Sequence, residues 1–455
     1  MPVLHAARAL TPEGWKSEVR VTIEDGAIAA VETDALAQEG DERHAIMAPA
    51  AANLHSHAFQ RAMAGRAEVR GKEADTFWTW REAMYRFALM MSPEEVEAVA
   101  AQLYVEMLEA GFAAVAEFHY LHHAPDGSPY KQPAEIAGRI LSAARRVGIG
   151  MTLLPVFYAH STFDGAPPKP EQRRFVTDLA SYARLLDECR QLIKTEDGER
   201  IGVAPHSLRA VSSAELAELI SLAGESPIHI HAAEQTKEVE DCVAWSGARP
   251  VRWLIDHAGV DEKWCLVHAT HMDEGETRDL ARSGAVAGLC PVTEANLGDG
   301  IFNAANYIRD GGRYGVGTDS NVSIGLAGEL RQLEYAERLR ERARNVLAAP
   351  ESSCGRAMLE AVWVGGAQAL TRNSGKLAPG ATADILTFRA DHPTLAGKTD
   401  DQVLDAWIFS VGDALVDCVW SCGLKVVAGG RHVFRDQIVG QFAKTMEELS
   451  QRSPS

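Results

Sequence analysis

The chain has 455 residues and a formal net charge of −18 at pH 7, with 46% hydrophobic and 24% charged residues. This balance suits a globular protein with one large domain and a smaller one beside it. The negative charge disfavours nucleic acid and anionic membranes as partners. Because no apolar run has transmembrane length and the N-terminus lacks a signal-peptide pattern, we expect a cytoplasmic protein whose seven cysteines form no disulfide framework.

Both ends of the chain predict strands and turns. Residues 19–32 have the pattern of a hairpin, with an alternating strand, a turn at Glu24-Asp25-Gly26 and a second strand. Residues 383–388 and 417–427 predict further strands near the C-terminus. We therefore expect the two ends to pair into one small β-sandwich domain with a structural role.

The middle of the chain predicts helices that alternate with short apolar strands. Ser92-Pro93-Glu94-Glu95 is typical of a helix start, with a serine N-cap, a proline at the first helical position and a capping-box glutamate, and Gly111 ends this helix. Another helix starts at Ser212-Ser213, and the remaining ones are expected at residues 133–147, 171–192, 250–258, 273–283 and 329–347. The expected strands are residues 113–118, 150–157, 201–205, 227–230, 264–267, 285–289 and 314–317.

Together with a strand before His55, these segments make eight buried strands, most of them followed by a helix. Continuous apolar runs are typical of parallel strands that are covered on both faces. Eight such units predict an α/β fold, a (β/α)8 TIM-type barrel whose active site lies at the carboxyl ends of the strands. We expect the barrel at residues 48–374, the small β-sandwich domain at 1–47 and 375–440, and a C-terminal helix or tail at 441–455.

Polar residues follow most of these strands, and histidine recurs among them. His55 and His57 follow the first strand, and residues two apart in extended backbone point to the same side. Alone, a His-x-His pair is a weak signal, since two unrelated polar residues at a strand end have the same pattern. The other strand-end residues are Glu117, His119, Tyr120, His206, Arg209, His229, His231, Glu234, His268 and Asp319. Their placement on one rim of a barrel predicts a common site.

Several imidazoles with one carboxylate make a site that suits a divalent metal, Zn²⁺ in the first place and also Fe²⁺ or Mn²⁺. The expected ligands are His55, His57, His231 and Asp319. A metal held in this way acidifies a bound water and makes it a nucleophile near neutral pH.

Neighbouring residues complete the expected chemistry. Glu234, three residues after His231, is the candidate proton shuttle between the water and a leaving nitrogen. His268 is the candidate hydrogen-bond donor to an oxyanion or to the attacking water. Asp319 is expected to bind the metal and also to orient the water or accept its proton. His229 alternates with His231, so we expect it to point away from the barrel mouth and to be structural.

These strand-end motifs resemble the amidohydrolase superfamily and, within it, the mononuclear deaminase branch. The resemblance rests on the His-x-His pair, the His-x-x-Glu segment 231–234, His268 and Asp319. The fourth strand ends in His206 rather than in lysine. The resemblance therefore implies one metal ion rather than two ions bridged by a carboxylated lysine.

The segments around the motifs resemble the formimidoylglutamate deiminases of histidine degradation. They are residues 53–61, 77–81, 117–123, 204–209, 231–235 and 317–321. The resemblance implies a homodimer that hydrolyses N-formimidoyl-L-glutamate to N-formyl-L-glutamate and ammonia. It also implies that the substrate is held by Gln60, Arg81, Tyr120, His206 and Arg209. Arginine suits a dicarboxylate because its planar guanidinium binds a carboxylate through two parallel hydrogen bonds.

Other functions stay open at this point. A deaminase of the same branch that acts on a purine-like or pyrimidine-like heterocycle would favour aromatic stacking and amide contacts over two arginines. A non-enzymatic barrel used as a scaffold would be expected to lose metal ligands, whereas the full set is present here. A carbohydrate-active barrel is disfavoured because the strand ends carry histidines rather than paired carboxylates.

Overall fold

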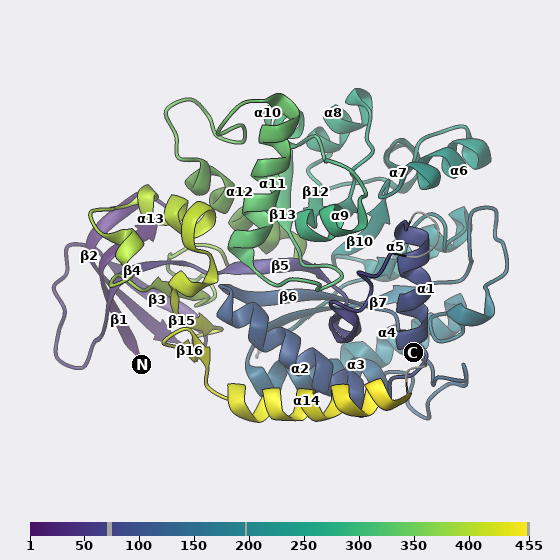
Figure 1. Cartoon of the computed structure of the whole chain (residues 1–455), viewed down its shortest axis with the longest axis horizontal. Coiled ribbons are helices and arrows are strands. Elements are labelled where there is room, and N and C mark those ends of the chain that lie inside the picture. The colour runs from purple at the N-terminus through teal and green to yellow at the C-terminus, as the bar shows by residue number, and fades with distance from the viewer. Residues whose placement is uncertain (71–74, 196–197, 453–455) are drawn as a thin grey trace.

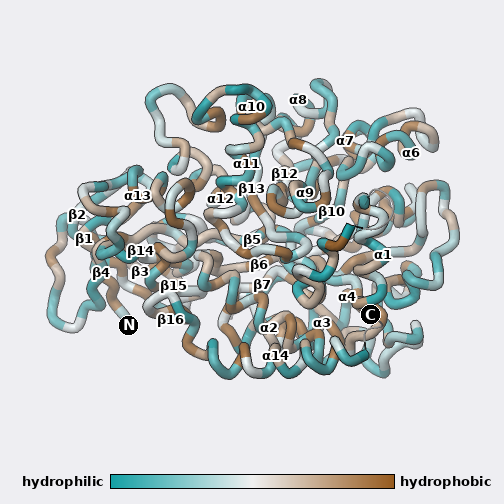
Figure 2. The backbone as a smooth tube through the Cα atoms, in the orientation of Figure 1, coloured by the Kyte–Doolittle hydropathy of each residue, from teal (hydrophilic) through white to brown (hydrophobic). Residues whose placement is uncertain are grey.

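The computed structural model describes residues 1–70, 75–195 and 198–452. Figure 1 shows a barrel of strands surrounded by helices, with a β-rich region at the left that is built from the purple and yellow ends of the chain. Among the described helices, none combines the length and the apolar character that a membrane span needs. Figure 2 shows hydrophilic outer loops and hydrophobic segments along the central strands, which agrees with the complete burial of Leu54, Val115 and Leu154.

The barrel strands run parallel to their neighbours. They are β5 (Ala51–Ser56), β6 (Phe112–His119), β7 (Gly150–Phe157), β8 (Arg200–Ile201), β9 (Ala204–Pro205), β10 (Ile228–Ala232), β11 (Trp264–His268), β12 (Val286–Leu289) and β13 (Arg313–Val316). One sheet contains β5 to β8, with β9 also on β7, and another contains β10 to β13. Parallel bridges between Val203 and Ile228 and between Ser56 and Asp319 join the two sheets at both edges. The expected barrel of eight strand positions is therefore confirmed.

The fourth strand position is split into β8 and β9, whereas the sequence predicted one strand over residues 201–205. Gly202 lies at the break, and its N–H donates to the Leu153 carbonyl at 2.9 Å. A Cβ atom at Gly202 would lie 2.5 Å from Leu154 Cδ2 and 2.6 Å from the Pro227 carbonyl oxygen. The neighbouring strands thus approach so closely that this position requires glycine.

Helices cover the outside of the barrel and part of its mouth (Figure 1). They are α1 (Phe77–Ala88), α2 (Pro93–Glu109), α3 (Glu135–Val147), α4 (Leu179–Leu192), α5 (Ser213–Ala223), α6 (Thr236–Ser246), α7 (Pro250–Ala258), α8 (Glu274–Ser283), α9 (Pro291–Leu297), α10 (Ala304–Arg309), α11 (Leu326–Glu341) and α12 (Cys354–Ala369). Short 3₁₀ turns at Ala58–Met63 and Pro170–Gln172 follow β5 and precede α4.

Helix ends follow the capping chemistry in the sequence, with two corrections. The predicted capping box of α2 is present, since the Ser92 hydroxyl accepts from the Glu95 N–H at 3.3 Å. The expected helix 171–192 is right only from Leu179, because the Asp178 carboxylate accepts from Ser181 N–H and caps α4 there. The expected helix 329–347 ends at Glu341, where Arg342 takes a left-handed conformation with φ of +53°.

The two chain ends form one eight-stranded sheet in the order β17-β16-β15-β14-β4-β1-β2-β3. Its strands are β1 (Val3–Thr11), β2 (Gly14–Glu24), β3 (Ala27–Glu32), β4 (Glu42–Pro49), β14 (Ile385–Phe388), β15 (Val416–Ser421), β16 (Leu424–Ala428) and β17 (Arg431–His432). Antiparallel pairing of β4 with β14 joins the N-terminal and C-terminal parts, as expected. Helices α13 (Asp401–Ala406) and α14 (Arg435–Arg452) lie beside it and along α2, respectively (Figure 1). The domain limits drawn from the sequence stay a prediction.

Candidate active site

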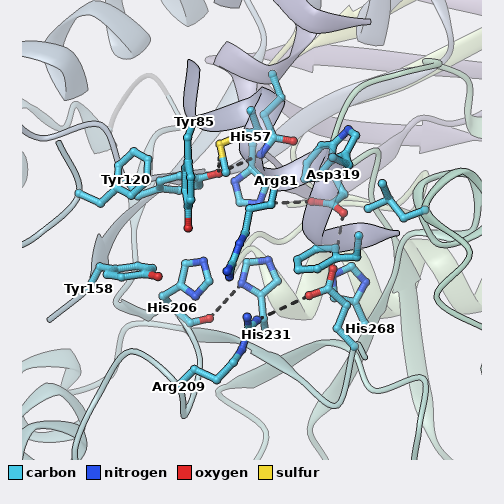
Figure 3. A pocket seen from close by; sticks show the side chains of 17 residues that line it. His57, Arg81, Tyr85, Tyr120, Tyr158, His206, Arg209, His231, His268 and Asp319 are labelled. Atoms are coloured by element: carbon cyan, nitrogen blue, oxygen red, sulfur yellow. Dashed lines mark hydrogen bonds and ion pairs between the residues drawn. The ribbon is translucent and has the colours of Figure 1, made fainter. Parts of the chain in front are cut away.

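A pocket with about 550 Å³ of empty space, part of it open to solvent, lies at the carboxyl ends of the barrel strands. Figure 3 shows Asp319 and His268 at one side of this pocket and Tyr120, Tyr158 and His206 at the other. The predicted residues that line it are His57, Gln60, Arg81, Tyr120, His206, Arg209, His231, Glu234, His268 and Asp319. His55, the remaining predicted residue, is fully buried beside His57 and His231. The structure thus brings the whole predicted set to one place.

Four potential metal ligands converge at one end of the pocket. The Nε2 atom of His55 lies 3.2 Å from His57 Nε2, 3.0 Å from His231 Nε2 and 3.3 Å from Asp319 Oδ1. His57 Nε2 lies 3.2 Å from the same carboxylate oxygen. Ligands about 2.05 Å from a central Zn²⁺ in tetrahedral geometry are about 3.3 Å apart. The spacing of these donor atoms therefore fits a small divalent ion.

Outer hydrogen bonds turn the metal-binding nitrogens inward. His57 Nδ1–H donates to the Phe118 carbonyl at 2.8 Å, and His231 Nδ1–H donates to the His206 carbonyl at 2.9 Å. Burial holds the pKa of His231 well below its ordinary value and lowers that of His55 to about 3. The imidazoles of His55 and His231 are therefore neutral at pH 7, which is the form that binds a metal.

The carboxylate of this cluster is ionised. Burial alone raises the pKa of Asp319, but its close contacts with the imidazoles of His55 and His57 outweigh this effect and hold the pKa well below the ordinary range. Asp319 also has a left-handed backbone with φ of +44°, as do His268 at +68° and Ala233 at +52°. Non-glycine residues rarely adopt such angles, and they gather at functional sites.

Glu234 lies next to the metal cluster, where the expected proton shuttle should be. Its carboxylate lies 3.7 Å from His268 Nε2 and 3.7 Å from Arg209 Nη2. Burial raises its pKa, against the opposing effects of these two cations. The Glu238 carboxylate accepts from the N–H groups of Ala233 and Glu234 at 3.1 and 3.3 Å and so fixes the loop that carries the shuttle.

His268 is held as a hydrogen-bond donor by a residue that the sequence did not single out. Its Nδ1–H donates to Glu294 Oε1 at 3.2 Å, and its Nε2 lies 3.9 Å from Asp319 Oδ2. Burial lowers the pKa of His268, but Glu234, Glu294 and Asp319 outweigh it and raise the value to about 10. Glu294 lies on α9, a helix that carried no recognised motif, so only the folded structure reveals this contact.

Two arginines line the pocket away from the metal ligands. Arg209 is buried and its nearest carboxylates, Glu234 and Glu238, lie at 3.7 and 3.8 Å, beyond close ion-pair distance. Arg81 lies over the rings of Trp78 and Tyr85, at 4.5 and 5.6 Å from their centroids. Among the described residues, no carboxylate lies within 4.0 Å of the Arg81 guanidinium. Both cations are thus available to an anionic ligand.

The remaining predicted binding residues are fixed by neighbours. Gln60 Nε2–H donates to the Tyr120 hydroxyl at 2.9 Å, and Tyr120 packs edge-on against the His57 ring. The pKa of His206 is well below its ordinary value because of burial and the nearby Arg209 charge, so its imidazole is neutral. His229 Nε2–H donates to the Ala369 carbonyl at 2.8 Å, and His229 is not among the residues that line the pocket, as expected.

Aromatic and aliphatic residues complete the wall, and the sequence had not assigned most of them. They are Phe77, Trp80, Met84, Tyr85, Tyr158, Phe175 and Leu297. Several lie on α1, which buried Arg174 anchors by donating to the carbonyls of Ala88 and Met91. These residues come from separate segments that meet only in the folded chain, so no local spacing signalled them.

The model of the amidohydrolase family matches residues 46–427 of this chain. The chain belongs to the amidohydrolase family. A second model, the N-terminal domain of formimidoylglutamate deiminase HutF, matches residues 1–45. With the convergent site above, membership makes this protein a metal-dependent hydrolase of the amidohydrolase type.

Known enzymes are similar to this chain over 92% or more of its length. It is 48% identical over 452 residues to the formimidoylglutamate deiminase of Pseudomonas aeruginosa, covering 99% of this chain and 100% of that protein. It is 26% identical over 435 residues to the 8-oxoguanine deaminase of the same organism, covering 92% and 90% of the two chains. A crystal structure of an amidohydrolase from Brucella melitensis is similar with a TM-score of 0.95 at 53% identity, covering 99% and 100%.

Proposed function

We propose that this amidohydrolase hydrolyses N-formimidoyl-L-glutamate to N-formyl-L-glutamate and ammonia. The observation that carries the proposal is the pairing of a four-residue metal site with two arginines, Arg81 and Arg209, in one pocket. The substrate has an amidine carbon that needs an activated water and two carboxylates that need cations. The full-length similarity to a formimidoylglutamate deiminase supports the same substrate.

The proposed metal is Zn²⁺, held by His55, His57, His231 and Asp319, since three imidazoles and one carboxylate suit this ion. When bound, the ion supplies Lewis acidity that makes water a nucleophile near neutral pH. A metal with different preferences, Fe²⁺ or Mn²⁺, binds the same donor types and is distinguished by metal analysis of the purified protein.

In the proposed reaction, the oxygen of water forms a bond to the formimidoyl carbon and the bond from that carbon to its terminal nitrogen breaks. Glu234 takes one proton from the attacking water and gives it to the terminal nitrogen. It then moves the second water proton from the hydroxyl of the tetrahedral adduct to the same nitrogen, so that the formyl C=O forms and ammonia departs. His268 donates a hydrogen bond to the developing oxyanion, while Asp319 orients the water. Gln60, Arg81, Tyr120, His206 and Arg209 hold the substrate.

The test is ammonia release by the purified, metal-assayed protein from N-formimidoyl-L-glutamate, with guanine, cytosine and adenosine assayed beside it. We expect release from formimidoylglutamate that a chelator abolishes and Zn²⁺ restores. Release from a heterocycle and none from formimidoylglutamate would overturn the proposed substrate.

We also propose that the enzyme is a cytoplasmic homodimer that acts in histidine degradation. The similarity to a formimidoylglutamate deiminase over the whole chain supports the pathway. Light scattering on a size-exclusion column tests the assembly, for which we expect twice the 49.3 kDa mass of one chain. A monomer mass across the working concentration range would refute the dimer.

A further inference from the structure

A pair of tyrosines lies in the pocket wall that no motif assigned. Tyr85 comes from α1, and Tyr158 directly follows β7. Both side chains are buried and both line the pocket with Arg81 and Arg209. Figure 3 shows their hydroxyl ends directed toward the same region of the pocket, near the end of the Arg81 side chain.

One buried glutamine connects the two phenols. Gln172, with no exposed surface, donates from Nε2 to the Tyr158 hydroxyl at 2.7 Å and to the Tyr85 hydroxyl at 3.2 Å. Its Oε1 accepts from the Lys169 N–H at 2.8 Å, which fixes the orientation of the amide. Both amide hydrogens therefore point at tyrosine oxygens, and each phenol oxygen accepts one hydrogen bond from Gln172.

The hydrogen-bond inventory leaves a donor free for a ligand. A tyrosine hydroxyl has one hydrogen to donate, and neither phenol donates to a carbonyl or carboxylate oxygen in residues 1–70, 75–195 and 198–452. The two hydroxyls interact with each other, which occupies at most one of the two hydrogens. At least one O–H therefore faces the pocket, where burial raises the pKa of Tyr158 above its ordinary value and keeps its proton in place.

The surroundings of this donor favour an anion. The charges of both Arg81 and Arg209 act on the Tyr158 phenol, and both lower its pKa against the effect of burial. An acceptor bound there accepts a hydrogen bond from the neutral O–H group and is attracted by the two guanidinium charges. This combination suits a carboxylate. An amide or a ring nitrogen would gain less from the two charges.

The position of the pair suits the end of the substrate that is far from the reaction. The ring of Tyr158 lies 4.7 Å from that of His206, which lies 4.9 Å from that of the metal ligand His231. In N-formimidoyl-L-glutamate the reacting carbon and the side-chain carboxylate are five bonds apart, about 6 Å when extended. The α-carboxylate is three bonds away and stays nearer the metal end.

We propose that Tyr85 and Tyr158 bind the side-chain carboxylate of the substrate, and that Gln172 is the positioning residue that keeps their hydroxyl hydrogens directed into the pocket. The inference rests on the proposed function, which it deepens by naming a group that selects a glutamate side chain. It adds two residues to the predicted substrate-binding set and one residue that positions them.

The test compares kinetics on two substrates, N-formimidoyl-L-glutamate and N-formimidoyl-L-2-aminobutyrate, which lacks the side-chain carboxylate. The variants are Tyr85→Phe, Tyr158→Phe and Gln172→Glu; the last keeps the shape of the amide but turns it into an acceptor that draws the phenol hydrogens away. With the glutamate substrate we expect KM to rise about tenfold or more while kcat stays within about twofold, because uniform binding is lost. With the aminobutyrate substrate we expect each variant to match the wild type.

Tyr182→Phe is the matched control. Tyr182 is also buried, and its hydroxyl donates to the Pro155 carbonyl at 2.9 Å outside the pocket. We expect this variant to lose thermal stability without a change in KM. An equal loss on both substrates in the pocket variants, or an unchanged KM in all of them, would overturn the inference.

Calorimetric titration of glutarate into the Zn²⁺-loaded protein separates this inference from the proposed reaction. If the wild type releases no ammonia from formimidoylglutamate, the proposed function fails by itself. Weaker glutarate binding in Tyr158→Phe and Gln172→Glu than in Tyr182→Phe would still support a carboxylate site at the tyrosines. Equal affinity in all four proteins would refute it.

Discussion

Replacing Glu234 by glutamine changes the proposed proton shuttle with little change in shape. Glu234 is not among the four metal ligands, and its carboxylate lies between the cations of Arg209 and His268 at 3.7 Å from each. The amide keeps the volume of the side chain but cannot accept a proton from water and release it to the leaving nitrogen. We therefore expect one bound metal per chain, as in the wild type, and a loss confined to turnover.

The magnitude follows from two effects. Loss of general acid–base catalysis lowers kcat by about 10²–10⁴-fold. The lost carboxylate also removes a gross attraction to Arg209 of about 4.5 kcal/mol, taking the 3.7 Å separation and an effective dielectric constant of 20. Because that attraction competes with the substrate carboxylate for Arg209, we expect KM to stay level or to fall.

The assay is steady-state ammonia release with metal content measured on the same preparation. Glu238→Gln is the matched control. The Glu238 carboxylate lies 3.8 Å from the same arginine, but its hydrogen bonds are to the backbone N–H groups of Ala233 and Glu234 and it has no role in the proposed proton transfer. We expect the control to lose less than about tenfold in kcat. A Glu234→Gln enzyme that turns over within about threefold of the wild-type rate would refute the shuttle.

Four further results are expected. Removal of the metal by a chelator lowers the thermal midpoint as well as turnover, because the four clustered ligands lose their common partner, and an unchanged midpoint in calorimetry would contradict the site. Glu294→Gln lowers kcat about tenfold with little effect on KM, because it weakens the hydrogen bond that orients His268, and a wild-type kcat would show that this bond is not needed. Gly202→Ala lowers the free energy of unfolding, measured by urea denaturation, by about 1–3 kcal/mol. Gly328→Ala does not lower it, because a Cβ atom there meets no neighbouring atom within 4 Å. Equal effects of the two substitutions would refute the close approach of the strands at Gly202. Burial raises the pKa of Asp413 to about 7 in the folded chain, so the folded state holds this proton more tightly than the unfolded state does. The free energy of unfolding therefore falls by about 1.4 kcal/mol per pH unit as the pH rises from about 4 to 7. An Asp413→Asn variant that keeps the same slope would contradict this cause.

The barrel and the metal-ligand set were accessible from the sequence because their signals are local. The strands are short apolar runs, and His55 and His57 share one strand end, where the period of extended backbone puts both rings on one side. Parallel strands in a barrel bring all carboxyl ends to one rim, which links these histidines to His231 and Asp319 across the chain.

The residues that the sequence did not identify depend on packing between distant segments. Tyr85, Tyr158 and Gln172 come from a helix, a strand end and a 3₁₀ turn, and each is an ordinary core residue by local pattern. Glu294 supports His268 from α9. The split of the fourth strand at Gly202 is likewise set by contacts with neighbouring strands rather than by its own sequence.

The central claim concerns which carbon–nitrogen bond of the substrate breaks, and the products report this directly. The measurement is mass spectrometry of the products formed from N-formimidoyl-L-glutamate in ¹⁸O-labelled water by the Zn²⁺-loaded enzyme. The proposed reaction predicts ammonia and N-formyl-L-glutamate in equal amounts, with one labelled oxygen in the formyl group. Formation of glutamate and formamide, which requires cleavage of the other carbon–nitrogen bond, would contradict it.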